Sequence, residues 1–340
     1  MKEESSQNNQ IYYNKTEILS SIEKNGKYEI DSTLIIKWFN DNYKDSEMYI
    51  IKISEKNNKN KIIFIGTIND NFKREGYCVN NYLNGDIYFG YYSNDLRNKS
   101  GIYIYKPKPI LTKTNKNILY QYYFGLWNND IKNGKGIYIW IKDEYKIFIN
   151  NNNKIYNPFK NFENTNFQAY VGNIQNNNFT KGTLLKKEGN NYFIYFGNFS
   201  KELKKEGNNC FYYCSKLEEL FFGNFENDVF IEGYVTKFDN IGNIKDIIYF
   251  KNKKISNKID LEKKDNKNIS EKITKFTKII KSQNYLLILH NIFKDIINFK
   301  NENMNNITIF NNDKYSQLID IFSLLNKVTI FEDIENNLKN

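Results

Sequence analysis

The chain has 340 residues, of which 40% are hydrophobic and 16% aromatic, and its formal net charge is +10. This length allows one to three domains. An apolar run of about 18 residues, which a transmembrane helix needs, does not occur. Three cysteines do not suggest a secreted disulfide framework. Because residues 1–5 do not open a signal peptide either, we expect an intracellular, cytoplasmic protein.

The N-terminal region, residues 1–45, carries the weakest pattern, and we interpret it as a capping segment. Thr16 is a candidate N-cap for a short helix that stops at Asn25 and Gly26. Residues 34–39 are mostly apolar, which fits either a helix or a buried strand. We favour a helix that covers the open edge of the first hairpin, because an exposed sheet edge needs such cover.

A repeated pattern follows over residues 46–250. Its best copy, residues 123–138, reads as two short strands joined by a polar turn. Each copy places an aromatic residue two positions before a glycine and a bulky residue two positions after it. A second glycine follows ten or eleven residues after the first. The first glycines of the six copies are Gly66, Gly90, Gly125, Gly172, Gly197 and Gly223. Internal repeats of this kind predict a stack of small structural units that bury a shared core.

The spacing also predicts where the side chains point. Alternate residues of a strand share a face, so the aromatic residue, the glycine and the bulky residue point the same way. The glycine leaves a bare patch of backbone on which an aromatic ring of a neighbouring hairpin can rest. Residues 93–95 and 128–130 supply Asn and Asp, which tolerate the left-handed backbone of tight turns. Each copy is therefore predicted to be one β-hairpin.

This pattern resembles the MORN (membrane occupation and recognition nexus) repeat, whose consensus runs roughly Tyr-x-Gly-x-Trp-x-x-Gly-x-x-x-Gly-x-Gly. The copy at 123–136 matches best, with Asp130 in place of the first turn glycine, and the copy at 88–101 has Lys99 where a glycine is expected. The other four copies are one residue shorter between glycines, so we expect their turns to differ. The resemblance implies a mainly β fold, an elongated single-layer antiparallel sheet of repeated hairpins (a MORN solenoid). The bias toward Asn, Lys and Ile is typical of an AT-rich protozoan genome.

Several strands are expected outside the clearest copies. Residues 49–53 predict a first strand that pairs with the strand ending at Gly66. A degenerate copy is expected before Gly172, with residues 145–149 as one strand. Residues 106–117 lengthen one loop between copies, and residues 247–250 predict the last strand of the array.

The composition changes at Lys251. Residues 251–281 hold eleven lysines against four acidic residues, so this stretch contributes +7 of the total charge of +10. Its second half predicts a helix capped by Ser270, with Ile273 and Phe276 on the apolar side. Further helical segments are expected at residues 285–293 and around residues 315–325. We therefore expect a lysine-rich, helical C-terminal region over residues 251–340.

No group of residues predicts catalysis. His290 lies within an apolar helical stretch, which favours a structural histidine. Cys210 and Cys214 share a strand face but lack further ligands at zinc-like spacing. There is no phosphate-binding loop of the GxxxxGK type, and the repeat accounts for the notable glycines. The sequence therefore predicts a non-enzyme without cofactor or metal.

The first functional hypothesis is a protein-binding scaffold. Residues 102–105 and 137–140 are apolar on both strand faces, so the second face must be covered either by the chain itself or by a partner. The resemblance implies scaffolds that tie the cytoskeleton to membranes, and arrays that bind helical peptides, so we expect a helical peptide or a cytoskeletal protein as partner. A homodimer is compatible with the same pattern. The candidate partner-binding residues form an aromatic ladder: Tyr88, Tyr92, Tyr123, Trp127, Tyr170, Tyr195, Phe199, Phe221 and Phe225.

The alternative hypothesis is a peripheral membrane protein that binds anionic phospholipid. Basic residues near an anionic surface contribute about 1 kcal/mol each, but a merely solvated helix explains the same pattern. A location at the cytoskeleton or at the cytoplasmic face of a membrane would fit either hypothesis. Nucleic-acid binding is not expected, because aromatic residues do not interleave the basic stretch. The candidate lipid-binding residues are Lys272, Lys275, Lys278 and Lys281.

Overall fold

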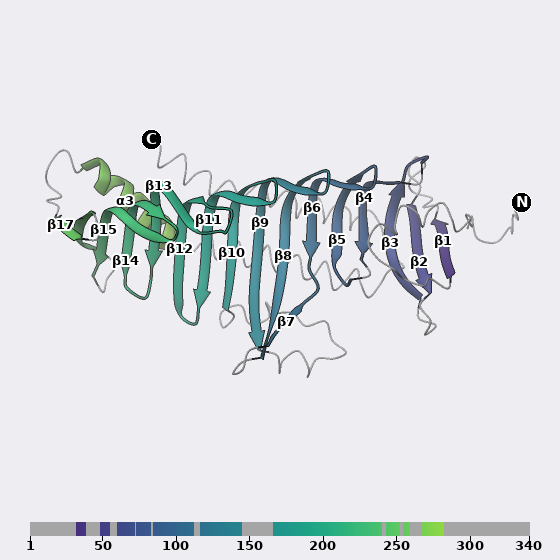
Figure 1. The fold of residues 1–340 in the computed structure, drawn as a ribbon, viewed down its shortest axis with the longest axis horizontal. Helices are drawn as coiled ribbons and strands as arrows, with labels where there is room; N and C mark the ends of the chain where they lie inside the picture. The colour runs from purple at the N-terminus through teal and green to yellow at the C-terminus, as the bar shows by residue number, and fades with distance from the viewer. Residues whose placement is uncertain are drawn as a thin grey trace, which may run out of the picture. The chain divides into compact units, whose positions relative to one another are not determined.

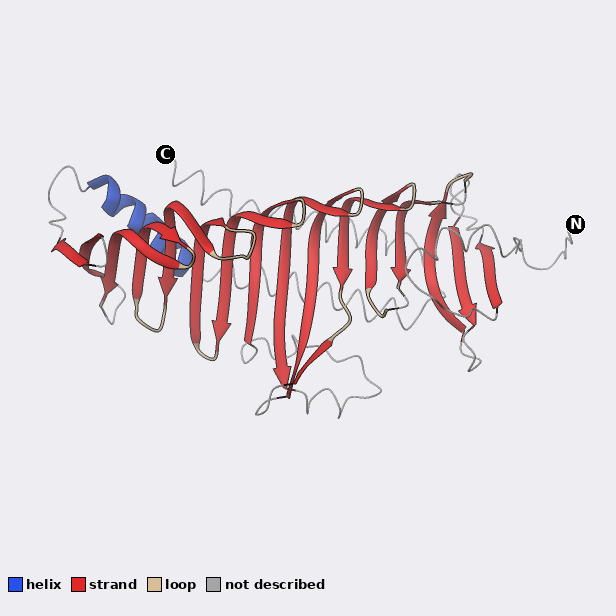
Figure 2. Ribbon diagram, viewed as in Figure 1, coloured by secondary structure: helices blue, strands red, loops and turns tan. Residues whose placement is uncertain are grey.

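The computed structural model describes residues 32–38, 48–54, 60–71, 73–82, 84–111, 116–144, 166–239, 243–251, 254–258 and 267–281. These residues form a mainly β fold of antiparallel strands (Figure 1), and helix α3 (Lys267–Lys281) is the one helix among them (Figure 2). The chain divides into two compact units. Unit 1 comprises residues 1–106 and 122–134, and unit 2 comprises residues 107–121 and 135–340. Strands β8 (Lys116–Asn128) and β9 (Ile131–Glu144) contribute residues to both units.

Unit 1 is a run of antiparallel strands in sequence order. Besides parts of β8 and β9, its strands are β1 (Ser32–Trp38), β2 (Met48–Ser54), β3 (Asn60–Ile68), β4 (Arg74–Asn81), β5 (Ile87–Ser93) and β6 (Leu96–Ile104). Each pairs with the next, and β6 pairs with β8. The predicted first strand is confirmed as β2, which pairs with β3 and places Tyr49 opposite Gly66.

The helix predicted at residues 34–39 is wrong, because Ser32–Trp38 forms strand β1. The register places Ile35 opposite Ile51 of β2. The consecutive β-branched residues Ile35 and Ile36 favour an extended backbone. The periodicity allowed either a helix or a strand, and the pairing with β2 shows that the segment is a strand. The helix predicted after Thr16 lies outside the described residues.

Unit 2 begins with a short strand, β7 (Lys108–Leu111), which pairs with the first residues of β8. This strand lies within the insert that we predicted as a lengthened loop. The remaining strands are β10 (Asn166–Gln175), β11 (Asn178–Glu188), β12 (Asn191–Phe199), β13 (Lys205–Cys214), β14 (Glu219–Glu226), β15 (Val229–Phe238), β16 (Ile244–Lys251) and β17 (Lys254–Lys258). From β10 to β17 each strand pairs with the next.

Three further predictions concern the ends of this array. The strand predicted at residues 247–250 is confirmed within β16, but it is not the last one because β17 follows. Helix α3 begins at Lys267, three residues before the predicted cap Ser270. Residues 145–149, 285–293 and 315–325, for which a strand and helices were predicted, lie outside the described residues.

The repeat glycines line up across neighbouring strands, and a tyrosine ring covers each row. The two rows are Gly90, Gly101 and Gly125 in unit 1, and Gly172, Gly182 and Gly197 in unit 2. A Cβ atom at Gly101 would lie only 2.5 Å from Cζ of Tyr88. We expected the ring of a neighbouring hairpin at this place, but the ring comes from the same hairpin. Tyr88 precedes Gly90 by two residues on the same strand face, so its side chain leans over the bare backbone.

The hydroxyl of this tyrosine fixes the strand just beyond the glycine. It donates a hydrogen bond to the carbonyl oxygen of the residue three positions further on in both units. The bonds are Tyr88 to Tyr91 (3.2 Å), Tyr123 to Leu126 (2.8 Å), Tyr170 to Asn173 (2.6 Å) and Tyr195 to Asn198 (2.9 Å). Three of these strands change register next to the glycine, and the tyrosine hydroxyl satisfies a carbonyl of that irregular stretch.

Four hairpins share one tight turn of two residues with positive φ, which matches the twist of the flanking strands. The turn residues are Asn94 and Asp95, Asn129 and Asp130, Asn176 and Asn177, and Asn227 and Asp228. The expected left-handed backbone is thereby confirmed. Our expectation that the shorter copies have different turns is wrong for the two that start at Gly172 and Gly223. The extra residue of the copy that starts at Gly90 lies at the register shift beyond that glycine, where Lys99 has a φ of 51°.

Both faces of the central strands are buried. In unit 1, Ile102 and Ile104 are buried on the face opposite to Tyr103, and in unit 2 the same holds for Ile137 and Ile139. The apolar rows that could have needed a partner are therefore covered within the chain. Helix α3 provides part of this cover in unit 2, because Ile273 is 0% exposed and packs in one cluster with residues of β12, β13, β14 and β16 (Figure 2).

Candidate binding surface

Rings of the aromatic ladder predicted from the repeat contact one another within each unit. In unit 1 Tyr88 contacts the ring of its own copy, Tyr92, at 5.1 Å between centroids and that of the next copy, Trp127, at 5.7 Å. In unit 2 Tyr195 contacts Phe199 at 5.0 Å and Phe225 at 5.5 Å in the same way. All four contacts are edge-to-face, a geometry worth about 0.5–1.5 kcal/mol beyond burial. The rings therefore tie consecutive hairpins together.

The ladder does not form an exposed surface, and this corrects the expectation that it is open to a partner. Eight of its nine residues are buried, and Phe221 is partly exposed. Burial raises the pKa of Tyr88 and Tyr92 well above the ordinary value. The reason lies in the motif, since each ring fills the space above a glycine row and against the next ring. The buried residues are Tyr88, Tyr92, Tyr123, Trp127, Tyr170, Tyr195, Phe199 and Phe225.

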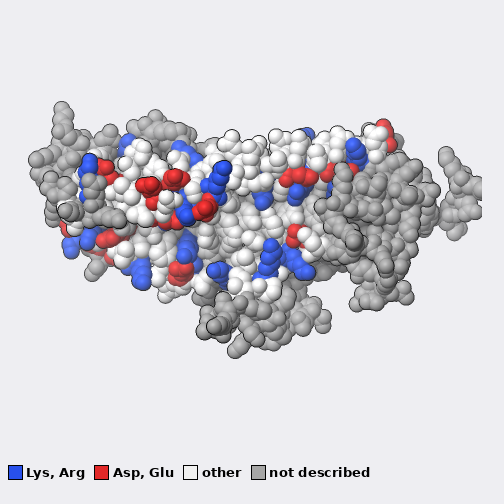
Figure 3. Space-filling view, viewed as in Figure 1, with Lys and Arg blue, Asp and Glu red and all other residues white. Residues whose placement is uncertain are grey.

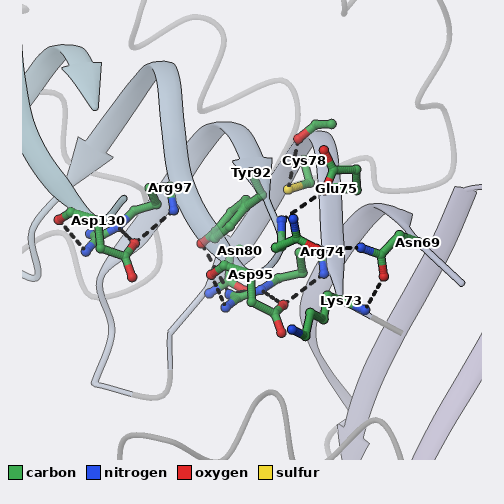
Figure 4. Close-up of polar contacts among 12 residues, drawn as sticks. Asn69, Lys73, Arg74, Glu75, Cys78, Asn80, Tyr92, Asp95, Arg97 and Asp130 are labelled. Atoms are coloured by element: carbon green, nitrogen blue, oxygen red, sulfur yellow. Dashed lines mark hydrogen bonds and ion pairs between the residues drawn. The ribbon is translucent and has the colours of Figure 1, made fainter. Parts of the chain in front are cut away.

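A second repeated feature, which the sequence analysis missed, joins three of the four turns to the preceding hairpin, and Figure 4 shows two of them. Asp95, in the turn between β5 and β6, accepts hydrogen bonds from the backbone N–H and the side-chain Nε of Arg74, at 2.8 Å and 2.9 Å. Its own N–H donates to the Arg74 carbonyl oxygen at 3.0 Å. Asp130 holds Arg97 in the same way, with Oδ1 at 2.9 Å from N and 2.7 Å from Nε. We call this arrangement the turn interlock.

Unit 2 repeats the turn interlock with a lysine. Oδ1 of Asp228 accepts from N of Lys205 at 2.9 Å and from Nζ at 3.1 Å, and the Asp228 N–H donates to the Lys205 carbonyl oxygen at 3.1 Å. The sequence signal is a basic residue at the start of a strand, followed 21 to 33 residues later by the turn aspartate. Because this separation changes with loop length, a search at a fixed period does not find it.

The cations of the turn interlock also lie over the ladder rings. The Arg74 guanidinium carbon is 4.3 Å from the ring centroid of Tyr92, and that of Arg97 is 4.3 Å from Trp127. Burial by itself lowers the pKa of both arginines, but neighbouring phenols and the paired aspartates outweigh it and raise the pKa. Both guanidinium groups therefore stay charged, and cation–π contact adds to the ion pair.

Exposed aliphatic side chains recur directly after the turns. Leu96 is 39% exposed, Ile131 is 40% exposed and Val229 is 48% exposed, and each follows the turn aspartate. In unit 1 Leu126 adds a fourth such side chain near the same edge. We call these residues the turn-edge side chains. On the face seen in Figure 3, acidic and basic side chains are interspersed among the described residues.

The lysine face of helix α3 is placed only in part. Lys275 is exposed and Lys272 is partly exposed, whereas the side chains of Lys278 and Lys281 lie outside the described part of the chain. Ile273 is buried against the sheet and Ile269 packs against the same cluster, so these two apolar side chains of the helix are already in contact with the chain. The lysines of α3 could therefore act on a surface through charge.

Other chemistry in the described residues is limited. Cys78, Cys210 and Cys214 are free and buried, and burial raises the pKa of the Cys78 and Cys210 thiols. Within the described strands and helix, no three acidic, cysteine or histidine side chains gather as a metal site. His290 lies outside them. None of the helical residues placed in the structure form a segment long and apolar enough to cross a membrane.

Comparison with known proteins finds no matching protein-family model and no matching curated protein. The resemblance to MORN repeats therefore stays a prediction from the motif, and so does the protozoan source.

Proposed function

We propose that the protein is a non-enzymatic, MORN-like scaffold that binds protein partners through its turn-edge side chains. The observation that carries this proposal is the recurrence of an exposed aliphatic residue after the turn aspartate, as at Leu96, Ile131 and Val229. Burying such side chains against a partner contributes roughly 25 cal/mol per Å² of apolar surface. The aromatic ladder would serve as the frame that holds these side chains in place.

The turn interlock supports this role because it fixes the backbone on which the exposed residue sits. Asp130 immediately precedes Ile131, and its carboxylate and N–H are both bonded to Arg97. A fixed backbone lowers the entropy that binding must overcome. The apolar side of a helical peptide or of a cytoskeletal protein would suit such an edge, and we propose a cytoplasmic location at the cytoskeleton or a membrane face.

The proposal is tested by affinity purification and mass spectrometry with the double variant Leu96→Ser, Ile131→Ser. Leu217→Ser is the matched control, because Leu217 is 58% exposed but lies in the turn between β13 and β14, outside the turn-edge set. We expect the double variant to lose specific partners that the control keeps. A purified partner should then bind the double variant about tenfold or more weakly. Retention of the same partners by both variants would contradict the proposal.

A second candidate is binding of anionic lipid by α3, favoured by the burial of Ile273 together with the exposure of Lys275. A single electrostatic contact gives weak, reversible attachment. We expect co-sedimentation with anionic but not neutral liposomes. Binding should weaken in 1 M salt, where the Debye length is about 3 Å. Replacing Lys272, Lys275, Lys278 and Lys281 by Gln should abolish it, and equal binding by this variant would exclude α3 as the lipid site.

A further inference from the structure

Strand β17 in unit 2 has one edge that no described strand covers. It pairs with β16, and among the strands that the structure describes it pairs with no other (Figure 1). An edge strand presents a row of backbone N–H and C=O groups with which another chain can pair. Many proteins protect such an edge with lysines, so the lysines of β17 by themselves indicate no more than protection.

An apolar side chain lies exposed on this strand. Ile255 is 72% exposed, the most among the large hydrophobic side chains of the described residues. The register places it directly opposite Phe250 of β16, whose ring stacks on that of Phe230 at 5.7 Å between centroids. Phe230 in turn contacts Phe225 of the aromatic ladder at 5.2 Å. The apolar row of the ladder therefore continues to Ile255, beyond which the described strands supply no further neighbour.

The same strand carries positive charge. Residues 251–258 contain four lysines and no acidic residue. Lys254 lies directly opposite Lys251, and like charges directly opposite each other destabilise a sheet. Lys251 is paired with Glu232 at 3.1 Å, but the same Glu232 carboxylate also accepts a hydrogen bond from the Tyr249 hydroxyl. An acidic group on the outer side of β17 would therefore be stabilising.

The acidic residues of this part of the chain do not cancel its charge. On β16, Asp246 is matched by its neighbour Lys245. Asp260 and Glu262 follow β17 in the sequence and lie outside the described residues. When these three residues and Glu232 are all counted, five lysines stand against four acidic residues. The balance stays positive, which favours an acidic partner.

We propose that β17 accepts an added strand from an acidic protein partner, an extended segment in which acidic and aliphatic residues alternate. Lys254 and Ile255 are adjacent and therefore lie on opposite faces of the strand. An aliphatic residue of the partner would extend the apolar row beside Ile255, and an acidic residue would lie beside Lys254. Backbone hydrogen bonds would supply affinity, as in other cases of strand addition.

A second copy of the chain is disfavoured at this edge. Antiparallel pairing of β17 with itself would bring Lys254 of each copy opposite Lys258 of the other, and both contacts would be repulsive. Ile255 is not one of the turn-edge side chains, so this inference goes beyond the proposed function and names a separate place of contact.

The test measures the binding of fluorescent peptides to the full chain by anisotropy. The probe is a blocked peptide of alternating glutamate and valine. A lysine–valine peptide has the opposite charge, and a glutamate–valine peptide with every backbone amide N-methylated keeps the charge but donates no backbone hydrogen bond. We expect saturable binding of the unmodified glutamate–valine peptide alone. Hydrogen exchange of residues 254–258 should become slower when it binds.

Variants of the chain locate the site. Ile255→Ser should weaken the binding about tenfold. Leu217→Ser, at an exposed leucine in the turn between β13 and β14, is the matched control and should leave the binding unchanged. The double variant Lys254→Glu, Lys258→Glu should reverse the preference, so that the chain binds the lysine–valine peptide instead.

Several results would overturn the added strand. The glutamate–valine peptide does not bind in a saturable way, or the N-methylated peptide binds equally well, which would leave charge alone as the cause. Unchanged affinity of Ile255→Ser together with an unchanged preference of the double variant would place the binding elsewhere. Self-association that Ile255→Ser abolishes, without peptide binding, would assign the edge to a second copy. The turn-edge proposal is tested with other residues, Leu96 and Ile131, so either proposal can fail while the other holds.

Discussion

At the scale of single residues, the tyrosine and the glycine act together in the four copies that carry a tyrosine two residues before the first glycine. Tyr88 occupies the volume that Cβ atoms at Gly90 and Gly101 would need. Its ring is fully buried between Tyr92 and Trp127, and its hydroxyl is bonded to the Tyr91 carbonyl oxygen. The ring has no room to move aside, which explains why both strands of the hairpin carry glycine at this level.

The first prediction is that Gly101→Ala destabilises the protein by about 1–3 kcal/mol, the usual cost of an overpacked core. The new methyl group would lie 2.5 Å from Cζ of Tyr88, far inside contact distance. Urea unfolding measured by circular dichroism gives the change in free energy. Ser93→Ala, at the end of β5, is the control and should change it by less than about 0.5 kcal/mol. A Gly101→Ala protein as stable as the control would show that the ring is not confined.

The second prediction concerns the carboxylate of Asp228. Burial by itself raises its pKa, but the hydrogen bonds and charge of Lys205 outweigh burial and hold the pKa below its ordinary value of 3.8. A carboxyl whose pKa is lower in the folded state contributes stability above its unfolded-state pKa and loses it as pH falls through the folded-state pKa. The stability difference between the native protein and Asp228→Asn should therefore be constant above about pH 5 and shrink below about pH 4.

Urea unfolding at a series of pH values measures this difference. Glu226→Gln, next to the same turn and exposed, is the control for removing one negative charge without removing the turn interlock. A difference between native and Asp228→Asn proteins that stays the same from neutral to acidic pH would mean that the Asp228 carboxylate does not hold Lys205 in solution.

At the scale of elements, the sequence predicts the hairpins well because their pattern is local. Turn residues such as Asn129 and Asp130 have the positive φ that their composition predicts, and the strands around Gly125 follow the alternation of side chains. The helix prediction for strand β1 is wrong because a short run of apolar residues shows neither the helical nor the strand periodicity. Its pairing with β2 depends on residues outside that run. The turn interlock was missed because a contact between hairpins depends on loop lengths as well as on residue type.

The sequence likewise could not predict whether the aromatic ladder is exposed or buried. The pattern places Tyr88, Trp127 and their equivalents on one face, but it does not say what covers that face. The sequence also does not say whether Ile102 and Ile137, on the other face, are covered by a partner or by the chain itself. Their burial in the structure shows that the chain covers them. In unit 2 the amphipathic pattern of α3 predicted an apolar side, and Ile273 confirms that this side faces the sheet.

The third prediction tests the cover that α3 provides. Ile273 is fully buried in a cluster with Phe196, Phe211 and Phe222, so Ile273→Ala should cost about 2–5 kcal/mol of the docking free energy of the helix. Hydrogen exchange should become faster in α3 and in the amides of β12 to β14. Glu271→Ala, an exposed position of the same helix, is the control. Unchanged exchange in the Ile273→Ala protein would mean that α3 does not rest on these strands.

At the scale of the whole molecule, the two compact units raise the question of how cooperatively the protein unfolds. In repeat architectures each hairpin depends on its neighbours, so stability can differ along the array. Three buried, free cysteines report on this difference: Cys78 lies in unit 1, and Cys210 and Cys214 lie in unit 2. Burial raises the pKa of the Cys78 and Cys210 thiols, so the reactive thiolate is scarce until the surrounding strands open.

The fourth prediction is that alkylation in a urea gradient gives two midpoints rather than one. Cys210 and Cys214 lie on the same strand, β13, and should become reactive together. Cys78, on β4, should become reactive at a different urea concentration, because its neighbours belong to the other unit. Mass spectrometry of the labelled peptides resolves the three sites, and Gly101→Ala, which strains only unit 1, should lower the Cys78 midpoint and leave the other two in place. If all three thiols instead share one midpoint, and Gly101→Ala shifts it equally for all three, the described hairpins unfold as a single cooperative unit.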